Sequence, residues 1–330
     1  MKCGMSEECD NIPKRVLFVA FPKSKMLDLV GPLQVFTDAS VNGKPCYVVT
    51  VSSPDGGVIR TDTVLPVSTV SLRNGPDTLY DTVIIVGGAG AFTAAKDPDA
   101  IALVKEVVHR SRRVGAVCTG AFVLAAAGIL ENRRVVTHWS ECSELASTYP
   151  SLQVEVDPIY VRDGHIWTSA GVTAGIDMAL AMVSEDYGKT VALDLARSLV
   201  SYLTRPGGQS QFSHLAHSRF REASDRFNAL HAWMQENLQS DLRIEALAAA
   251  ANMSPRNFSR VYALETGLSP AKAVEELRLQ EARKLLETSR MPIKAVAVKS
   301  GFGDEERLRR VMLRHLRISP SDYRDRFKTI

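Results

Sequence analysis

The 330-residue sequence has few of the features that mark secreted, membrane-spanning or cofactor-bearing proteins. Its five cysteines are odd in number and scattered, without a Cys-x-x-Cys pair, so we predict reduced thiols in a cytosol rather than a disulfide framework. The longest apolar run, residues 116–130, is too short and too poor in large side chains to span a bilayer. Residues 1–14 are polar and mixed in charge, which indicates a flexible tail and not a signal peptide. We therefore expect a cytoplasmic protein with no membrane partner.

The sequence also lacks a recognisable cofactor or metal motif. The run Gly87-Gly88-Ala89-Gly90 is not GxGxxG and lacks the context of a dinucleotide site. His138 and Cys142 lie four residues apart on an expected helix, but no third metal ligand is evident. We predict neither a cofactor nor a bound metal.

The small net charge of +3 hides an uneven distribution along the chain. Residues 205–330 contain 22 lysines and arginines against 15 acidic residues, whereas residues 1–204 contain 18 against 22. A basic C-terminal third suits a polyanionic partner, and the acidic remainder argues against binding along the whole surface.

Two copies of one pattern lie in this basic third, at 246–270 and 296–320, 50 residues apart. Each reads as a short apolar helix, a tight turn and a second helix with arginines on one side, which is typical of a helix-turn-helix. A helix expected over 269–288 joins them, and its length of roughly 30 Å is close to the roughly 34 Å between successive major grooves. We therefore predict a reader of double-stranded DNA with recognition helices in adjacent grooves.

The candidate DNA-binding residues lie on one side of each second helix. Arginine can bind guanine O6 and N7 with two hydrogen bonds, whereas other arginines hold phosphates or are only solvated. Arg260 and Arg310 are equivalent in the repeat and are the strongest candidates for base contact. Glu305 and Glu306 either accept from cytosine, complement the helix amino end or pair with neighbouring arginines, and we favour the last two. The candidate set is Arg256, Ser259, Arg260, Glu306, Arg307, Arg309 and Arg310, and the residues expected to face the core are Phe258, Val261, Tyr262, Leu308 and Val311.

The first two thirds of the chain alternate apolar strand-like runs with helical segments, which predicts a mostly parallel sheet covered on both faces. The expected strands are 15–21, 47–51, 82–86, 114–117, 135–137 and 165–169, and the expected helices begin near Pro32, Pro98, Ala121, His138, Ala174 and Val191. Sites in such sheets form at the carboxyl ends of strands. Asp28, Gly87-Gly88 and Cys118 mark those ends here.

Cys118 lies where a buried strand turns into a helix, so backbone N–H groups at the helix amino end would lower the pKa of its thiol and suit a nucleophile. Asp28 and His138 can converge on it, and the glycine backbone can act as an oxyanion donor. The alternatives are an inert buried thiol, a ligand pocket without turnover, and a redox sensor. The pocket candidates are Asp28, Gly88, Cys118, Thr119 and His138.

These motifs carry two family resemblances. Residues 229–327 resemble the AraC/XylS-type DNA-binding domain of seven helices, through both repeats and the closing Ser319-Pro320. One departure is Leu316-Arg317, where that family usually has Phe-Gly. Residues 15–203 resemble the ThiJ/PfpI-like, glutamine-amidotransferase-like fold, through the stretches 27–32, 118–121, 137–139 and 168–177. The resemblance implies a flavodoxin-like, mostly parallel α/β sandwich followed by an all-α domain with two helix-turn-helix motifs.

The join between the two parts resembles that of GlxA-type regulators. With the polar tail and the Pro, Gly and polar residues that begin the linker, we predict a tail (1–14), a ligand-sensing domain (15–204), a linker (205–228) and a DNA-binding domain (229–327). The resemblance also implies a small-molecule effector, with amino acids or amines the expected class, and a homodimer formed through the N-terminal domain. Trp139, Tyr160 and Trp167 can supply an aromatic cage for a cation, although core packing is the simpler interpretation. The alternative function is a thiol-dependent enzyme that resembles isonitrile hydratase, through Asp28, Cys118 and Thr119.

Overall fold

The structure is a computed structural model that describes residues 12–74, 79–201, 203, 208–209 and 227–327. The chain divides into two compact units, Met1–Arg205 and Pro206–Ile330. The predicted tail and the predicted linker fall largely outside the described residues. Within the described ranges, no helix is long and apolar enough to cross a membrane.

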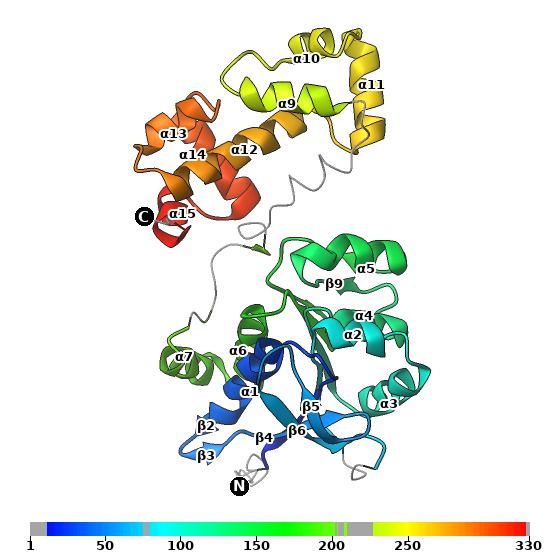
Figure 1. Cartoon of the computed structure of the whole chain (residues 1–330). Coiled ribbons are helices and arrows are strands. Elements are labelled where there is room, and N and C mark those ends of the chain that lie inside the picture. Colours follow the sequence, from blue (N-terminus) through cyan, green and yellow to red (C-terminus); the bar gives the residue numbers. More distant parts are fainter. Residues whose placement is uncertain (1–11, 75–78, 202, 204–207, 210–226, 328–330) are drawn as a thin grey trace, which may run out of the picture. The chain divides into compact units, whose positions relative to one another are not determined.

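A mostly parallel sheet of eight described strands forms the centre of the first unit, in the order β11-β12-β8-β7-β1-β4-β6-β5 (Figure 1). Strands from β12 to β6 pair in parallel, and β11 and β5 close the two edges antiparallel. The strands are β1 (Lys14–Val19), β4 (Tyr47–Ser53), β5 (Gly57–Arg60), β6 (Pro66–Ser71), β7 (Thr82–Ile85), β8 (Arg113–Val117), β11 (Tyr160–Asp163) and β12 (Ile166–Ser169). Short pairs outside the sheet are β2 (Ser40–Val41) with β3 (Lys44–Pro45), and β9 (Arg134–Val135) with β10 (Gln153–Val154).

Helices cover both faces of this sheet, because side chains of the central strands alternate between two apolar cores. Val16 and Phe18 of β1 face one core, and Leu17 and Val19 face the other. The first core is completed by α1 (Met26–Asp38), α6 (Ala174–Tyr187) and α7 (Lys189–Ser198). The second is completed by α2 (Ala89–Ala94), α3 (Pro98–His109), α4 (Gly120–Ala126) and α5 (Cys142–Thr148), the last preceded by a 3₁₀ turn, η1 (Trp139–Glu141). The predicted α/β sandwich is confirmed.

Two local expectations were wrong. The first helix was expected to begin near Pro32, but α1 begins at Met26 and holds Pro32 in its interior. Proline is costly there because it removes a hydrogen bond. Close packing offsets this cost, since a Cβ built on Gly175 of α6 would lie 3.4 Å from the Pro32 ring. The expected strand 135–137 lies outside the central sheet, which it meets through a bond from the Val136 N–H to Thr168 Oγ1.

The second unit is all-helical in its described part and contains the seven helices α9 to α15 (Figure 1). They are α9 (Asn228–Glu236), α10 (Ile244–Ala250), α11 (Pro255–Thr266), α12 (Pro270–Thr288), α13 (Ile293–Lys299), α14 (Glu305–Leu316) and α15 (Pro320–Phe327). One apolar core joins α9, α10 and α11 to the first half of α12, and another joins α13, α14 and α15 to its second half. The single helix α12 therefore joins the two helix-turn-helix units and contributes to both of their cores.

The two repeats are not in one constant register. The second helices α11 and α14 are offset by the 50 residues read from the sequence, but the buried pair Leu247 and Ala248 of α10 corresponds to Val296 and Ala297 of α13, an offset of 49. The turn of the second unit contains one extra residue, Gly303, which has φ +87°. The expected constant spacing was therefore wrong in the first helices, because glycine allows the longer turn.

Candidate nucleic-acid interface and ligand site

Helix α11 separates its polar and apolar residues as the sequence pattern predicts. Phe258 and Tyr262 are completely buried, whereas Arg256 and Arg260 are exposed. The Arg260 guanidinium lies 3.1 Å from Asn257 Oδ1, and the half-buried Ser259 hydroxyl donates to the Pro255 carbonyl at 2.9 Å. The two arginines thus form a positively charged surface on the side of the helix away from the core.

Helix α14 shows the same separation with different chemistry. Leu308 and Val311 are buried, and the polar residues Glu306, Arg307, Arg309 and Arg310 are exposed. Asp304 caps the helix by accepting from the Arg307 backbone N–H at 2.8 Å. Glu306 lies in the first turn and forms an ion pair with Arg309 at 3.6 Å. This pairing agrees with the favoured interpretation of Glu306, as a partner of arginine beside the positive helix amino end.

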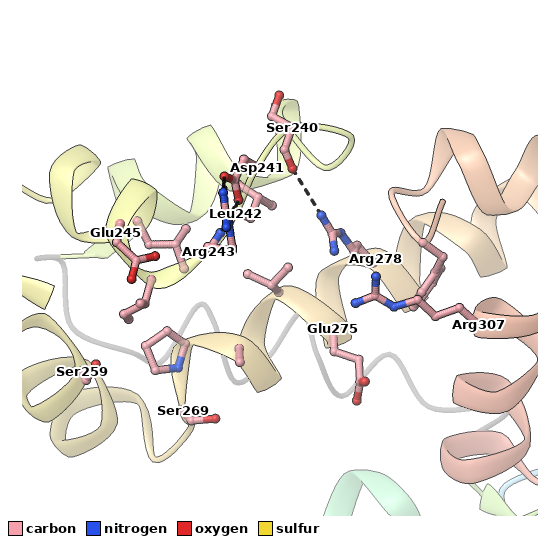
Figure 2. Close-up of a pocket in the computed structure, with 16 residues that line it drawn as sticks. Ser240, Asp241, Leu242, Arg243, Glu245, Ser259, Ser269, Glu275, Arg278 and Arg307 are labelled. Carbon is pink, nitrogen blue, oxygen red and sulfur yellow. Dashed lines mark hydrogen bonds and ion pairs between the residues drawn. The ribbon is translucent and has the colours of Figure 1, made fainter. Parts of the chain in front are cut away.

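Helix α12 holds the two recognition helices apart. Its 19 residues correspond to a length of about 28 Å. Figure 2 shows Ser259 of α11 and Arg307 of α14 on opposite sides of a groove that runs along α12. The turn of the second unit also packs on the loop after α9, because a Cβ on Gly301 would lie 1.9 Å from the Leu238 carbonyl oxygen. The spacing of the two helices is therefore fixed by packing within one domain.

The second candidate site surrounds Cys118, at the sharp turn between β8 and α4. Cys118 has φ +55°, and its backbone N–H donates to the Ser169 carbonyl of β12. Burial, together with the negative charge of Asp28, raises the pKa of the Cys118 thiol, and a bond from the Thr119 N–H lowers it only in part. The expected lowering of this pKa was wrong, because burial outweighs the N–H groups at the short helix α4. The thiol is therefore protonated at neutral pH.

Asp28 approaches Cys118 from the first turn of α1, and not from the end of a strand as expected. A Cβ built on Gly87 would lie 2.6 Å from Asp28 Oδ2 and 2.7 Å from Cys118 Cβ, so the two residues flank this glycine. Asp28 is fully buried, and Oδ2 has no partner with hydrogen-bond geometry among the described residues. Burial raises the pKa of Asp28 to about 6, while the Val172 N–H, Lys25 and the Cys118 thiol lower it in part.

Thr119 closes the side of the site next to Gly88. Its hydroxyl accepts from the Gly88 N–H at 2.8 Å and donates to the Gly88 carbonyl at 2.9 Å. The sequence had suggested that the glycine backbone could donate to an oxyanion. The Gly88 N–H is already bound to Thr119 and is not free for that role. Thr119 instead ties the start of α4 to the loop after β7.

The His138 ring makes its hydrogen bonds with Ser140, and not with Asp28 or Cys118. Its Nδ1 lies 2.7 Å from the Ser140 hydroxyl, its ring packs on Trp139, and burial lowers its pKa. The Cys142 thiol donates to the His138 carbonyl at 3.5 Å, and the described residues contain no cluster of three metal-ligating side chains. The expected convergence of His138 on Cys118 is therefore not seen in the contacts of the described residues.

The three aromatic residues considered for a cage do not form one. Tyr160 and Trp167 stack on each other at 6.0 Å, and the Arg162 guanidinium lies 5.1 Å from the Trp167 ring centre. Trp139 pairs with His138. Their contacts favour packing of the domain over recognition of a cationic ligand.

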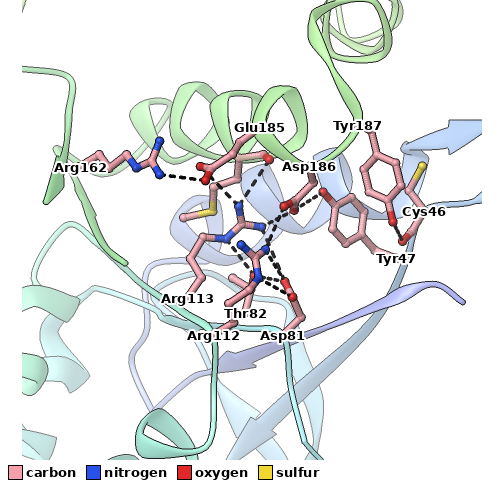
Figure 3. A network of polar contacts seen from close by, with 11 residues as sticks. Cys46, Tyr47, Asp81, Thr82, Arg112, Arg113, Arg162, Glu185, Asp186 and Tyr187 are labelled. Atoms are coloured by element: carbon pink, nitrogen blue, oxygen red, sulfur yellow. Dashed lines mark hydrogen bonds and ion pairs between the residues drawn. The ribbon is translucent and has the colours of Figure 1, made fainter. Parts of the chain in front are cut away.

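Sequence reasoning missed the backbone of Val172 and the buried network at the other end of α6. The Val172 N–H donates to Asp28 Oδ1 at 2.6 Å, just before α6 begins. At the end of the same helix, Asp186 accepts from Arg113 at 2.5 Å, Tyr47 at 2.8 Å and Arg112 at 2.9 Å (Figure 3). The stretch 168–177 was noted for its family likeness, but only the fold brings it against Asp28.

Comparison with known proteins agrees with this arrangement. The DJ-1/PfpI family matches residues 14–185, and a helix-turn-helix domain family matches residues 247–326. The HTH-type transcriptional regulator GlxA of Rhizobium meliloti is 28% identical, over 86% of this chain and 87% of that protein. The HTH-type transcriptional regulator Rv1931c of Mycobacterium tuberculosis is 32% identical, over 76% and 97%. Isonitrile hydratase of Pseudomonas putida is 33% identical, over 57% and 78%.

Among solved structures, a ThiJ/PfpI family protein from Pseudomonas syringae matches with a TM-score of 0.52 and 24% identity, over 62% of this chain and 84% of that one. This match shows the fold alone. An α/β unit of this fold, followed by two helix-turn-helix units, defines a DNA-binding regulator of transcription. The chain belongs to the DJ-1/PfpI family and joins it to an AraC-type helix-turn-helix domain, as GlxA-type regulators do.

Proposed function

We propose that this regulator binds specific DNA sequences in the cytoplasm and that its N-terminal domain senses a small metabolite. The observation that carries the DNA-binding part is the pair of helix-turn-helix units on α12, each with exposed arginines on its second helix. Arg260 and Arg310 point away from the cores and occupy equivalent positions. They are the residues that we assign to base contact.

A binding titration with the full chain tests this assignment. The duplex is one that the wild-type protein selects from a random library, and a scrambled duplex serves as the comparison. Arg260→Ala and Arg310→Ala should each reduce discrimination between the two by about 1–3 kcal/mol. Unchanged affinity and unchanged sequence preference in both variants would contradict it.

The sensing part rests on the buried carboxylate of Asp28. The Asp28 carboxylate is fully buried, and its charged form is costly there, so an effector that donates an N–H group to it would reduce that cost. Amines and amino acids carry such donors, which supports the amino acid or amine class. We assign Asp28, Gly88, Cys118 and Thr119 to the pocket wall, and His138 to its surroundings.

A thermal-shift screen of the full chain with amines and amino acids tests the sensing proposal. A ligand that binds only the folded state raises the melting temperature. The shift should be lost in Asp28→Ala and kept in Lys105→Ala, which removes an exposed charge from α3. Stabilisation that is indifferent to Asp28 would place the effector elsewhere.

We also propose that the chain forms a homodimer through its N-terminal domain. The hairpin of β5 and β6 carries the exposed apolar residues Val58 (69% exposed), Val64 (96%) and Leu65 (60%). Such a patch favours contact with a protein surface. Light scattering on the wild type and on Val64→Asp tests this, with a shift to monomer in the variant as the supporting result.

The alternative function is a thiol-dependent hydratase carrying a DNA-binding domain. The observation in its favour is the pairing of Asp28 and Cys118, together with the identity to isonitrile hydratase. The protonated thiol and the occupied Gly88 N–H count against it. Incubation with isonitriles decides: turnover that Cys118→Ala abolishes would establish the enzyme, and no turnover supports a pocket retired from catalysis.

A further inference from the structure

A groove of about 970 Å³ lies between the two recognition helices, along the first half of α12 (Figure 2). Residues from four segments line it. They come from the loop and helix within 240–247, from Ser259 of α11, from the N-cap and first half of α12 within 269–278, and from the pair Phe302 and Arg307 of the second unit. Arg260 and Arg310, the two residues assigned to base contact, are not part of its lining. The groove is therefore a surface separate from the proposed base-reading residues.

Three arginines and three acidic residues line the groove, but among the described residues none of these carboxylates forms an ion pair with Arg278 or Arg307. Asp241 is held by Arg243 through bonds of 2.6–2.9 Å, which lower its pKa to about 2. Glu275 is paired outside the groove, with Arg314 and with His315 at 2.8 Å. Glu245 stands in the first turn of α10, where it complements the positive helix amino end.

Arg278 and Arg307 remain without a carboxylate at ion-pair distance among the described residues. Arg278 donates from Nε to the Leu238 carbonyl at 3.1 Å and from Nη2 to the Ser240 carbonyl at 3.3 Å, so two backbone bonds hold its guanidinium in place. Burial lowers the pKa of Arg278, and the like charge of Arg307 lowers it further, whereas the negative charge of Asp241 raises it in part. The first residues of α12 open on the same groove and add the positive end of a helix.

Two recognition helices in adjacent major grooves on one face of a duplex have a minor groove between them, bordered by two phosphate backbones. The length of α12, about 28 Å, places the space between α11 and α14 opposite that segment. We propose that this groove seats the DNA backbone between the two half-sites, with Arg278 and Arg307 as phosphate contacts that position the protein without reading sequence. Within the candidate DNA-binding set, this assigns Arg307 to phosphate contact, and it rests on the proposed binding of DNA.

Phosphate contacts have a signature that base contacts lack. The loss of one phosphate contact makes the plot of the logarithm of the binding constant against the logarithm of the salt concentration less steep by about 1. The same loss weakens binding to all sequences nearly equally. We expect Arg307→Ala of the full chain to show both effects, on the selected and on the scrambled duplex. Lys105→Ala removes one positive charge from the other domain and should leave the slope unchanged.

Arg278 requires a second variant, because it also holds two backbone carbonyls. Arg278→Gln should reduce the salt slope by about 1, whereas Arg278→Lys keeps the charge and should keep the slope. A melting curve of each variant shows whether the domain is folded, and the exposed Arg307 tests the proposal if Arg278→Gln is not.

An unchanged slope in Arg307→Ala would overturn the proposal, and so would a loss of affinity confined to the selected duplex. Absence of DNA binding by the wild type would instead refute the proposed function. The two failures are therefore distinguishable.

Discussion

The backbone N–H of Val172 donates to Asp28 Oδ1 across 144 residues of sequence, at 2.6 Å, and so ties the start of α6 to the first turn of α1. The other end of α6 is held by Asp186, through Arg113, Arg112 and Tyr47. Helix α6 leads into α7, the last described helix of this unit. An effector that competes for Asp28 would therefore act first on α6, the helix that precedes α7.

Replacement of Asp28 by Asn should make the stability of the first unit less dependent on pH. The pKa of Asp28 is raised to about 6, so its contribution to stability is present below the unfolded pKa of about 4 and is lost as the pH rises through about 6. Above that range the charged form costs up to about 3 kcal/mol. Asp28→Asn keeps an acceptor for the Val172 N–H and should be the more stable protein at about pH 8.

Urea unfolding of wild type and Asp28→Asn at about pH 4 and about pH 8 measures this difference. Asp194→Asn, in an exposed pair with Arg197, is the matched control and should change stability by less than about 0.5 kcal/mol. A difference between wild type and Asp28→Asn that is the same at both pH values would show that Asp28 does not titrate as described.

Removal of the Arg113 side chain should strongly destabilise the first unit. Arg113 is 2% exposed and Asp186 is 4% exposed, so the variant Arg113→Met leaves a buried carboxylate with fewer partners. Breaking a buried ion pair costs about 3–5 kcal/mol, and we expect the lower end because Arg112 and Tyr47 still bind Asp186. Arg197→Met, which breaks an exposed pair, should cost less than about 1 kcal/mol. Equal unfolding midpoints for the two variants would contradict the role of the network.

Substitution of two glycines in the same turn distinguishes the cost of a steric clash from the cost of backbone strain. Gly301 and Gly303 have similar φ values, +82° and +87°, but a Cβ on Gly301 would meet the Leu238 carbonyl oxygen at 1.9 Å, while none of the described atoms lies within 4 Å of one on Gly303. Gly303→Ala should cost about 1–2 kcal/mol from the left-handed backbone alone. Gly301→Ala should cost clearly more and lower DNA affinity, because the second unit must shift on the loop after α9. Thermal melts of the two variants check this, and similar losses would argue against the packing.

Replacement of Arg317 by Gly should stabilise the second unit. Arg317 ends α14 in the left-handed region, φ +56°, at the position where Gly267 ends α11 with φ +69°. A non-glycine residue is disfavoured there by about 1 kcal/mol. Arg317→Gly should therefore raise the free energy of unfolding by about 0.5–1 kcal/mol, and Gly267→Ala should lower it by a similar amount. Opposite signs in chemical denaturation are the expected result, and a destabilised Arg317→Gly would reveal a contact made by the arginine.

The sequence predicts those features that depend on local pattern. The helix expected to begin near Ala174 is α6, which begins at that residue. The turn at Cys118 and the exposed arginines of α11 and α14 follow from the same kind of pattern. The departure at Leu316-Arg317 leaves the fold intact, because Arg317 adopts the conformation that glycine takes in the first repeat.

Features that depend on distant contacts could not be read in this way. The start of α1 at Met26 needs the packing of Pro32 on α6, and local rules place proline only in the first turn. The pKa of the Cys118 thiol depends on how deeply the fold buries it and on its distance from Asp28. The position of Arg278 beside Arg307 likewise results from the way α12 and α14 pack, and no spacing in the sequence indicates it.

Helix α12 separates two recognition helices, α11 and α14, whose exposed side chains differ in chemistry. Helix α11 presents two arginines and a serine, whereas α14 presents a glutamate among its arginines. If the chain bound the duplex in the reverse direction, each recognition helix would meet the half-site of the other. The bound protein therefore has a defined direction along the DNA. We expect the sequence recognised by one chain to be non-palindromic. The regulator would then face a promoter in one orientation, and inversion of its site would change the outcome of transcription without changing affinity.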